Sequence, residues 1–135
     1  MCHCLALRRA SRHITRLYDA ALRPVGLRIS QFSLLTVIDN HPGIKISDFG
    51  QIMVMERTTL LRNLKPLQVA GMVTIDRAEG ERGHVFKLTP KGKTRLEQAV
   101  PLWNAAQAGF EKKFGFEKAA RLRDDNLAVG AISAL

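Results

Sequence analysis

The stretch that decides the fold is Glu56–Gly71, ERTTLLRNLKPLQVAG. Three of its leucines recur at the i, i+4, i+7 spacing of one helix face: Leu60, Leu64 and Leu67. Three polar residues repeat that spacing on the opposite face: Thr58, Arg62 and Lys65. Gly71 follows as a residue suited to ending a helix, while Pro66 is expected to bend the axis. The stretch therefore predicts a helix with an apolar inner face and a basic outer face.

A hairpin is predicted directly after this helix. Met72–Ile75 and Val85–Leu88 are apolar and β-prone, and the charged segment Asp76–His84 between them contains glycine. The basic residues of this segment are expected to form a wing: Arg77, Arg82 and His84. Thr89 and Pro90 then match the N-cap and first position of another helix. Helix, hairpin and helix in this order predict a winged helix-turn-helix, a mainly α (α+β) fold with a two-to-three-stranded β-wing.

The outer face of the 56–71 helix suits DNA. Arginine can bond guanine through two hydrogen bonds, and threonine offers a hydroxyl and a methyl group to base edges. The residues expected to contact bases are Arg57, Thr58, Thr59 and Arg62, with Lys65 on a phosphate. Two alternatives stay open: an ordinary amphipathic helix with a solvated face, and a winged helix that contacts protein.

The chain resembles the multiple antibiotic resistance regulator (MarR) family at RTTLLRNLKPLQVAGMV, at the basic hairpin and at LTPKG. The resemblance extends upstream through LRRASRHITRLYDAALRPVGLRISQFSLL and covers nearly the whole chain. It implies a homodimeric winged-helix transcription factor, usually a repressor, that a small ligand or an oxidant releases from DNA. Family members commonly carry Asp-Arg-Arg at the wing, where this chain has Gly80-Glu81-Arg82, so only Arg82 corresponds. The turn before the 56–71 helix often contains glycine in the family, whereas here it is Met53-Val54-Met55-Glu56.

Composition agrees with a DNA-binding protein. With 135 residues the chain forms one domain, and its formal net charge of +9 is typical of a polyanion binder. No apolar run approaches the roughly 20 residues of a spanning helix, and no cleavable signal opens the chain, so we expect a cytoplasmic protein without a membrane partner. No Ser-His-Asp set, phosphate-binding glycine loop or metal-binding His pair is present, and we expect neither catalysis nor a cofactor.

The expected layout is a DNA-binding lobe at about 30–90 between helical regions at about 1–24 and 100–135. Ser30 and Ser47 are expected to cap the helices that follow them, and Ile44 to Ile46 to add a short strand. Phe49, Ile52 and Met53 are expected to pack against the 56–71 helix. Helices at both ends of the chain form a dimerisation region in the family pattern. Two recognition helices one DNA turn apart would also bind a palindromic operator. The alternative is that the terminal helices complete a monomeric core.

The first helix carries the hypotheses for an effector. Cys4 and Tyr18 match a cysteine and a tyrosine of the organic-hydroperoxide-sensing branch, which the resemblance implies contact each other across the dimer, and nearby arginines favour a reactive thiolate. The other two tyrosines of that branch correspond to Arg8 and Ile29, however. A small ligand is the expected trigger and oxidation of Cys4 the alternative. An anionic aromatic molecule would suit Arg12, Arg16 and Tyr18 as lining residues. Cys2, Cys4 and neighbouring histidines lack the usual spacing of a metal site, and we expect none.

Overall fold

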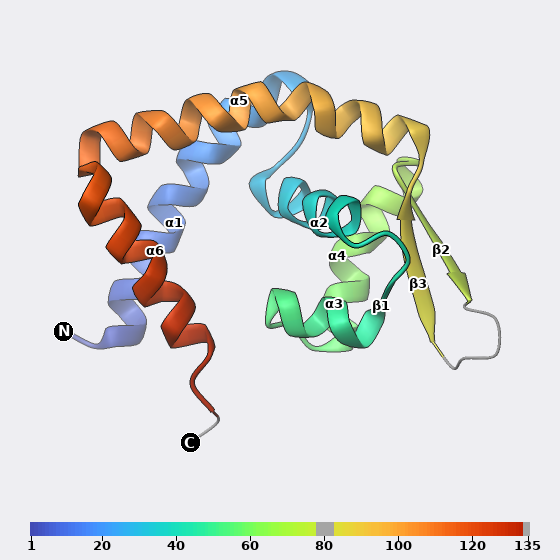
Figure 1. Cartoon of the computed structure of the whole chain (residues 1–135), viewed down its shortest axis with the longest axis horizontal. Helices are drawn as coiled ribbons and strands as arrows, with labels where there is room; N and C mark the ends of the chain where they lie inside the picture. The colour runs from blue at the N-terminus through green and yellow to red at the C-terminus, as the bar shows by residue number, and fades with distance from the viewer. Residues whose placement is uncertain (78–82, 134–135) are drawn as a thin grey trace.

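The computed structural model describes residues 1–77 and 83–133. Figure 1 shows an α-helical protein with a small sheet at one end and the two chain termini at the other. The helices are α1 (His3–Leu22), the 3₁₀ turn η1 (Arg23–Val25), α2 (Ile29–Asn40), α3 (Ile46–Met53), α4 (Arg57–Val69), α5 (Pro90–Phe114) and α6 (Phe116–Gly130). The strands are β1 (Ile44–Lys45), β2 (Val73–Arg77) and β3 (His84–Leu88). This is the winged helix-turn-helix that the sequence predicts.

The three strands form one antiparallel sheet in the order β1-β3-β2. In the hairpin, Val73 lies opposite Leu88 and Arg77 lies opposite His84. The short strand β1 pairs through Ile44 opposite Phe86 and confirms the third strand expected near Ile44. The sheet therefore fixes the wing beside the end of α4.

The core lies under α4, between α2, α3, α5 and the sheet. The leucine face of α4 is fully buried: Leu60, Leu64 and Leu67 are each 0% exposed. Phe49 and Phe86 meet edge-on with ring centroids 5.6 Å apart, which joins α3 to the sheet. Phe32 of α2 stacks on Trp103 of α5 at 5.7 Å. Aromatic pairs of this kind contribute about 0.5–1.5 kcal/mol beyond the area they bury.

The joint between α4, β2 and α5 is closely built. Gly71 adopts the left-handed conformation (φ +75°) that ends α4. Thr89 caps α5 by accepting a hydrogen bond from the backbone N–H of Gly92 at 3.1 Å, and Pro90 occupies the first turn. Gly92 leaves no room for a side chain, since an added Cβ would lie 2.1 Å from the carbonyl oxygen of Met72. The helix start predicted at Thr89 and Pro90 is confirmed.

Three local predictions are wrong. The cap of α2 is Arg28, not Ser30, and the first N–H of the helix, at Ile29, bonds Asp19 Oδ1 at 2.8 Å instead. The cap of α3 is Lys45 rather than Ser47, because the helix follows strand β1 directly. Ile52 is 47% exposed, while Phe49 fills the space below α4.

Helix α5 spans the expected boundary of the DNA-binding lobe. It is continuous from Pro90 to Phe114, although Pro101 lies inside it. At 1.5 Å per residue this is a rod of about 37 Å. Figure 1 shows it crossing the molecule from the sheet to the end formed by α1 and α6. One rigid element thus joins the wing to the terminal helices.

Candidate nucleic-acid interface

Helix α4 presents the predicted base-contacting residues to solvent. Its five polar candidates are all exposed: Arg57, Thr58, Thr59, Arg62 and Lys65. The first three form the opening turn, and the Leu60, Leu64 and Leu67 face holds the helix against the core. The buried face therefore fixes the orientation in which the polar face is presented.

The turn that leads into α4 contains an unusual backbone. Val54, 72% exposed, has φ 53° and ψ 49°, the left-handed conformation that favours glycine. An added Cβ on Gly50, one turn earlier, would lie 2.9 Å from the carbonyl oxygen of Met55. The turn that the sequence shows to lack the family's glycine is therefore tight, with Val54 in its left-handed position.

Two of the three basic residues predicted for the wing, Arg77 and His84, lie in its described strands. Arg77 is exposed at the end of β2, opposite His84 on β3. His84 is half-buried, and its Nδ1 atom is buried without a hydrogen-bond partner among the described residues. Arg82 lies outside the described residues. Sequence reasoning missed Lys87, which is exposed on β3 opposite Thr74 and adds a positive charge to the wing.

The residues predicted to bind an effector or to undergo oxidation do not lie together in one chain. Arg12 and Arg16 are exposed on α1 and line neither of the two cavities described below. Cys2 and Cys4 are free and exposed near the N-terminus. Cys4 and Tyr18 are fourteen residues apart on one helix, about 21 Å, so they do not meet within one chain.

Tyr18 belongs to a polar cluster between α1 and α5. Its hydroxyl donates a hydrogen bond to Gln107 Oε1, and Gln107 Nε2 donates to Glu111 Oε1 at 3.3 Å. Burial raises the pKa of Tyr18, and the negative charge of Glu111 raises the same pKa further. The cluster lines a cavity of about 310 Å³ that Arg123 and Asn126 of α6 also border.

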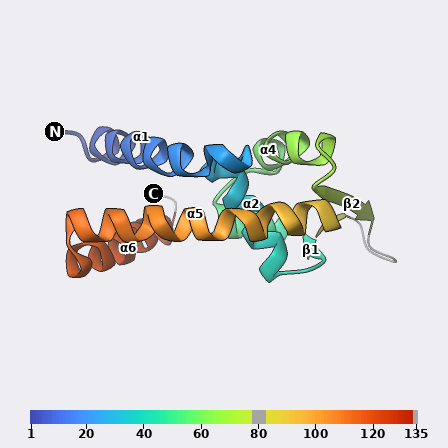
Figure 2. The same cartoon turned by 90° about the horizontal axis from the view of Figure 1, so that it is seen from above.

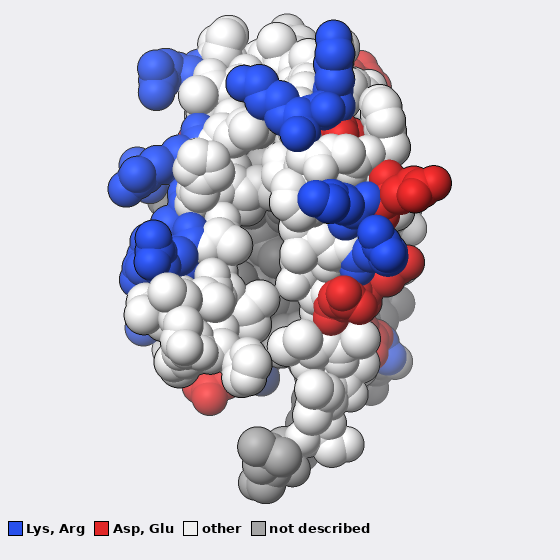
Figure 3. All heavy atoms as spheres, turned by 90° about the vertical axis from the view of Figure 1, so that its left-hand side faces the viewer, with Lys and Arg blue, Asp and Glu red and all other residues white. Residues whose placement is uncertain are grey.

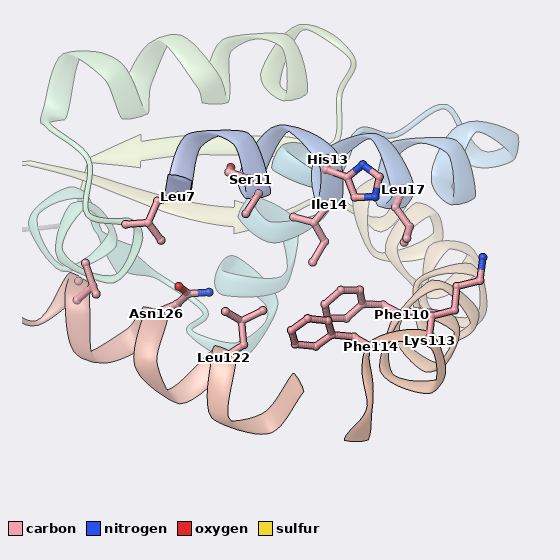
Figure 4. A pocket seen from close by; sticks show the side chains of 13 residues that line it. Leu7, Ser11, His13, Ile14, Leu17, Phe110, Lys113, Phe114, Leu122 and Asn126 are labelled. Carbon is pink, nitrogen blue, oxygen red and sulfur yellow. The ribbon is translucent and has the colours of Figure 1, made fainter. Parts of the chain in front are cut away.

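A larger groove of about 800 Å³ separates α1 from α6. Figure 4 shows Ile14 and Leu17 of α1 pointing toward Phe110 and Phe114 of α5, with Leu122 of α6 beside them. Figure 3 shows the same hollow from outside, as an uncharged floor between two helical walls. The groove depends on the packing of α1, α5 and α6 together, which the sequence alone does not show.

Two further findings concern other classes of site. Within residues 1–77 and 83–133, no three His, Cys, Asp or Glu side chains gather closely enough to hold a metal ion. No helix in those residues is both long enough and apolar enough to cross a membrane.

Known proteins of similar sequence and structure are transcriptional regulators. The chain is 38% identical to the Mycobacterium tuberculosis regulator MosR, solved in complex with DNA, over 96% of this chain and 94% of that one, with a TM-score of 0.88. It is 27% identical over 100 residues to the organic hydroperoxide resistance transcriptional regulator of Bacillus subtilis, covering 73% of this chain and 68% of the relative. A mutant MarR of Escherichia coli complexed with operator DNA shares the fold at 22% identity and a TM-score of 0.82, over 92% of this chain and 90% of that one. No protein-family model matches the chain.

Proposed function

The chain belongs to the MarR family of transcriptional regulators, and we propose that it is a homodimeric repressor of a palindromic operator in double-stranded DNA. The observation that carries the proposal is the orientation of α4. Its leucines are fully buried, and its arginines and threonines face outward beside a basic wing. MosR, the relative at 38% identity, was solved on DNA.

The positions of the polar residues indicate which of them contact DNA bases and which contact phosphates. Arg57, Thr58, Thr59 and Arg62 occupy the first two turns of α4, where a recognition helix approaches base edges. Lys65 lies one turn further along, where a flexible ammonium group suits a phosphate. The wing contacts the adjacent DNA backbone through Arg77, His84 and Lys87. Arg82 is proposed for the same contact on the basis of the sequence.

The groove between α1 and α6 supports a dimer. Its walls are apolar, and the exposed apolar residues beside it extend the patch: Phe114, Phe116, Leu127, Val129 and Ile132 are 42–68% exposed. A groove of this kind at the end of the molecule opposite the wing suits a second copy of the chain. Pairing there would place two α4 helices on one DNA duplex.

The same region suits a small effector. The cavity beside Tyr18 has an apolar side, formed by Ile14 and Phe110, and a polar side that includes Gln107 and Glu111. An aromatic molecule with a polar substituent matches this combination. Its binding would shift α5 relative to α1, and α5 would carry the change to the joint with α4.

The E. coli and M. tuberculosis proteins, like the B. subtilis one, are regulators rather than enzymes, and we propose no catalytic activity here.

Oxidation of Cys4 is a second candidate trigger. Both cysteines are free and exposed, so a hydroperoxide can reach them. The B. subtilis relative is named for organic hydroperoxide resistance. A thiolate that reduces a hydroperoxide to an alcohol becomes a sulfenic acid, which changes the polarity of the α1 start. Loss of DNA binding on addition of an organic hydroperoxide, absent in Cys4→Ser, would support this trigger, and equal loss in both proteins would contradict it.

DNA binding is tested by a salt series. The purified protein is titrated onto duplex DNA recovered from genomic fragments, and affinity is expected to fall by orders of magnitude between about 50 and 200 mM salt. Affinity that does not depend on salt, or no binding to any fragment, would contradict the proposal and favour a protein partner for the wing.

The dimer is tested by light scattering coupled to size-exclusion chromatography. Leu122→Glu places a charge in the groove and is expected to give a monomer with weakened operator binding. Gln98→Glu is the matched control, since it adds the same charge at an exposed position outside the groove. A wild-type protein that is monomeric at micromolar concentration would rule out the dimer.

A further inference from the structure

Helix α1 carries a row of arginines on the side away from the groove. The four members are all exposed: Arg8, Arg9, Arg12 and Arg16. At about 100° of rotation per residue they fall within roughly 100° of one another, and the centre of the row lies nearly opposite Ile14 and Leu17. The apolar side of α1 is therefore used for packing, while its other side is dominated by the four arginines, with Leu5 and Asp19 at its two ends.

No acidic side chain neutralises the row from within α1. The single acidic residue of the helix, Asp19, is engaged by the backbone N–H of Ile29 at 2.8 Å. None of the four arginines makes an ion pair with another described residue. Figure 3 shows a series of Lys and Arg side chains along the outer side of one wall of the groove, with an acidic group only near its lower end, whereas the other wall mixes positive and negative side chains. Charge of one sign, unpaired, indicates a polyanionic partner.

The row lies on the same side of the molecule as α4. Figure 2 shows α1 and α4 along one long edge and α5 and α6 along the opposite edge. Along that edge the order is wing, α4 and then α1, which ends at the groove. In a dimer paired through the groove, the two α1 helices would therefore lie between the two α4 helices.

We propose that the α1 arginine row is a second DNA contact, made to the sugar–phosphate backbone between the two operator half-sites. The proposal rests on the function proposed above, because it takes the duplex on α4 as given. The row from Arg8 to Arg16 is about 12 Å long. B-DNA carries about seven phosphate charges over that length, more than enough for four guanidinium groups. Such contacts add affinity and salt dependence without base specificity.

The test removes two charges from the row. Arg12→Gln with Arg16→Gln keeps good helix formers, and Lys112→Gln with Arg121→Gln is the control, removing two exposed charges from α5 and α6. Both variants lower the formal net charge from +9 by two. Helix content by circular dichroism and dimer mass by light scattering confirm that each is folded. The probe is a labelled duplex that the wild-type protein selects from a random-sequence library.

We expect the α1 variant to reduce the slope of log affinity against log salt by about 1.8, at roughly 0.9 for each lost phosphate contact. The ratio of the wild-type affinity for DNA to that of the α1 variant then grows about tenfold as the salt falls from 200 to 50 mM. The control variant should bind like the wild type. Neutral methylphosphonate linkages between the half-sites should weaken the wild type more than the α1 variant, which keeps only Arg8 and Arg9 of the row.

Three results would overturn the contact while leaving DNA binding by α4 intact. These are an unchanged slope in the α1 variant, an equal loss in the α5 and α6 control, and an equal cost of the neutral linkages to both proteins. A wild-type protein that selects no duplex would overturn both the contact and the proposed function. Wild-type binding to anionic vesicles that the α1 variant loses, with DNA affinity unchanged, would assign the row to a membrane surface instead.

Discussion

The hydroxyl of Thr89 donates a hydrogen bond of 2.5 Å to the carbonyl oxygen of Gly71, which joins the start of α5 to the end of α4. The backbone N–H of Thr89 bonds the carbonyl oxygen of Met72 at 3.1 Å, and Lys91 Nζ bonds that of Ala70 at 2.7 Å. The recognition helix is thus fixed to the helix that reaches the groove. Any movement of α5 at the groove is expected to change the orientation of α4.

Removing the Thr89 hydroxyl should weaken this joint. Thr89→Ala loses both the cap of α5 and the bond to Gly71, and we expect about 1 kcal/mol lower free energy of unfolding in urea. Thr89→Ser keeps the hydroxyl and should stay within a few tenths of a kcal/mol of the wild type. Equal stability of the alanine and serine variants would show that the hydroxyl bonds do not stabilise the joint.

A methyl group at Gly92 should disrupt the same joint by overpacking. In Gly92→Ala the added Cβ would lie 2.1 Å from the Met72 carbonyl oxygen, a backbone atom that must shift. We expect a loss of about 1–3 kcal/mol in urea unfolding, with weaker operator binding. Gly109→Ala is the matched control in the same helix, since nothing lies within 4 Å of its added Cβ. That variant should gain about 0.5–1 kcal/mol, and a loss of the same size at both positions would contradict the packing argument.

Glycine at position 54 should relieve backbone strain before α4. Val54 has φ 53° and is 72% exposed, so Val54→Gly removes a left-handed valine at little cost in buried area. We expect a gain of about 0.5–1 kcal/mol after the entropic cost of glycine. Val69→Gly is the comparison, because Val69 is 76% exposed but lies in α4, and there the change should destabilise. Destabilisation at both positions would show that Val54 is not strained.

Tyr18 should ionise above its ordinary pKa of 10.0 in the folded protein. It is the single tyrosine in the sequence, so phenolate absorbance during a pH titration reports this residue alone. Folding raises its pKa; the stability it contributes is therefore fully present below pH 10 and is lost as the pH rises through the folded value. Tyr18→Phe should lose this alkaline dependence. A titration midpoint unchanged by denaturant would contradict burial of the hydroxyl.

Substitutions of Arg62 and Lys65 should have different effects, because we expect Arg62 to contact a base and Lys65 to contact a phosphate. Arg62→Ala is expected to cost about 1–3 kcal/mol on the operator and much less on random duplex. Lys65→Ala should weaken binding to both and reduce the salt slope by about 0.9. Equal losses on both duplexes for Arg62→Ala would make that arginine another phosphate contact.

Several features could be predicted from the sequence because neighbouring residues alone determine them. The bounds of α4 follow from its leucine spacing and from Gly71, and the start of α5 follows from Thr89 and Pro90. The hairpin follows from two β-prone segments around a charged loop. Arg62 and Lys65 are exposed as expected, because burying the leucine face leaves their side of the helix outward.

Other features depended on residues distant in the chain. Ser30 is not the cap of α2, because the carboxylate of Asp19 in α1 satisfies the first helical N–H instead. Pro101 does not interrupt α5, whose neighbouring residue Leu102 packs against the core. The cavity beside Tyr18 needs Gln107 and Arg123, which only packing of α5 and α6 brings near it.

The sequence by itself determined the DNA-binding element of this protein, helix α4 with the hairpin that follows it. Helical periodicity, a glycine that ends the helix and a charged hairpin are all local properties of one continuous stretch. Only the tertiary structure decided how that element is connected and what surrounds it. The hydrogen bonds of Thr89, the closeness of Gly92 to Met72, the groove between α1 and α6 and the side on which the α1 arginines lie all join segments far apart in sequence. The physical reason is that such contacts depend on the packing of whole helices, which no single stretch of residues specifies.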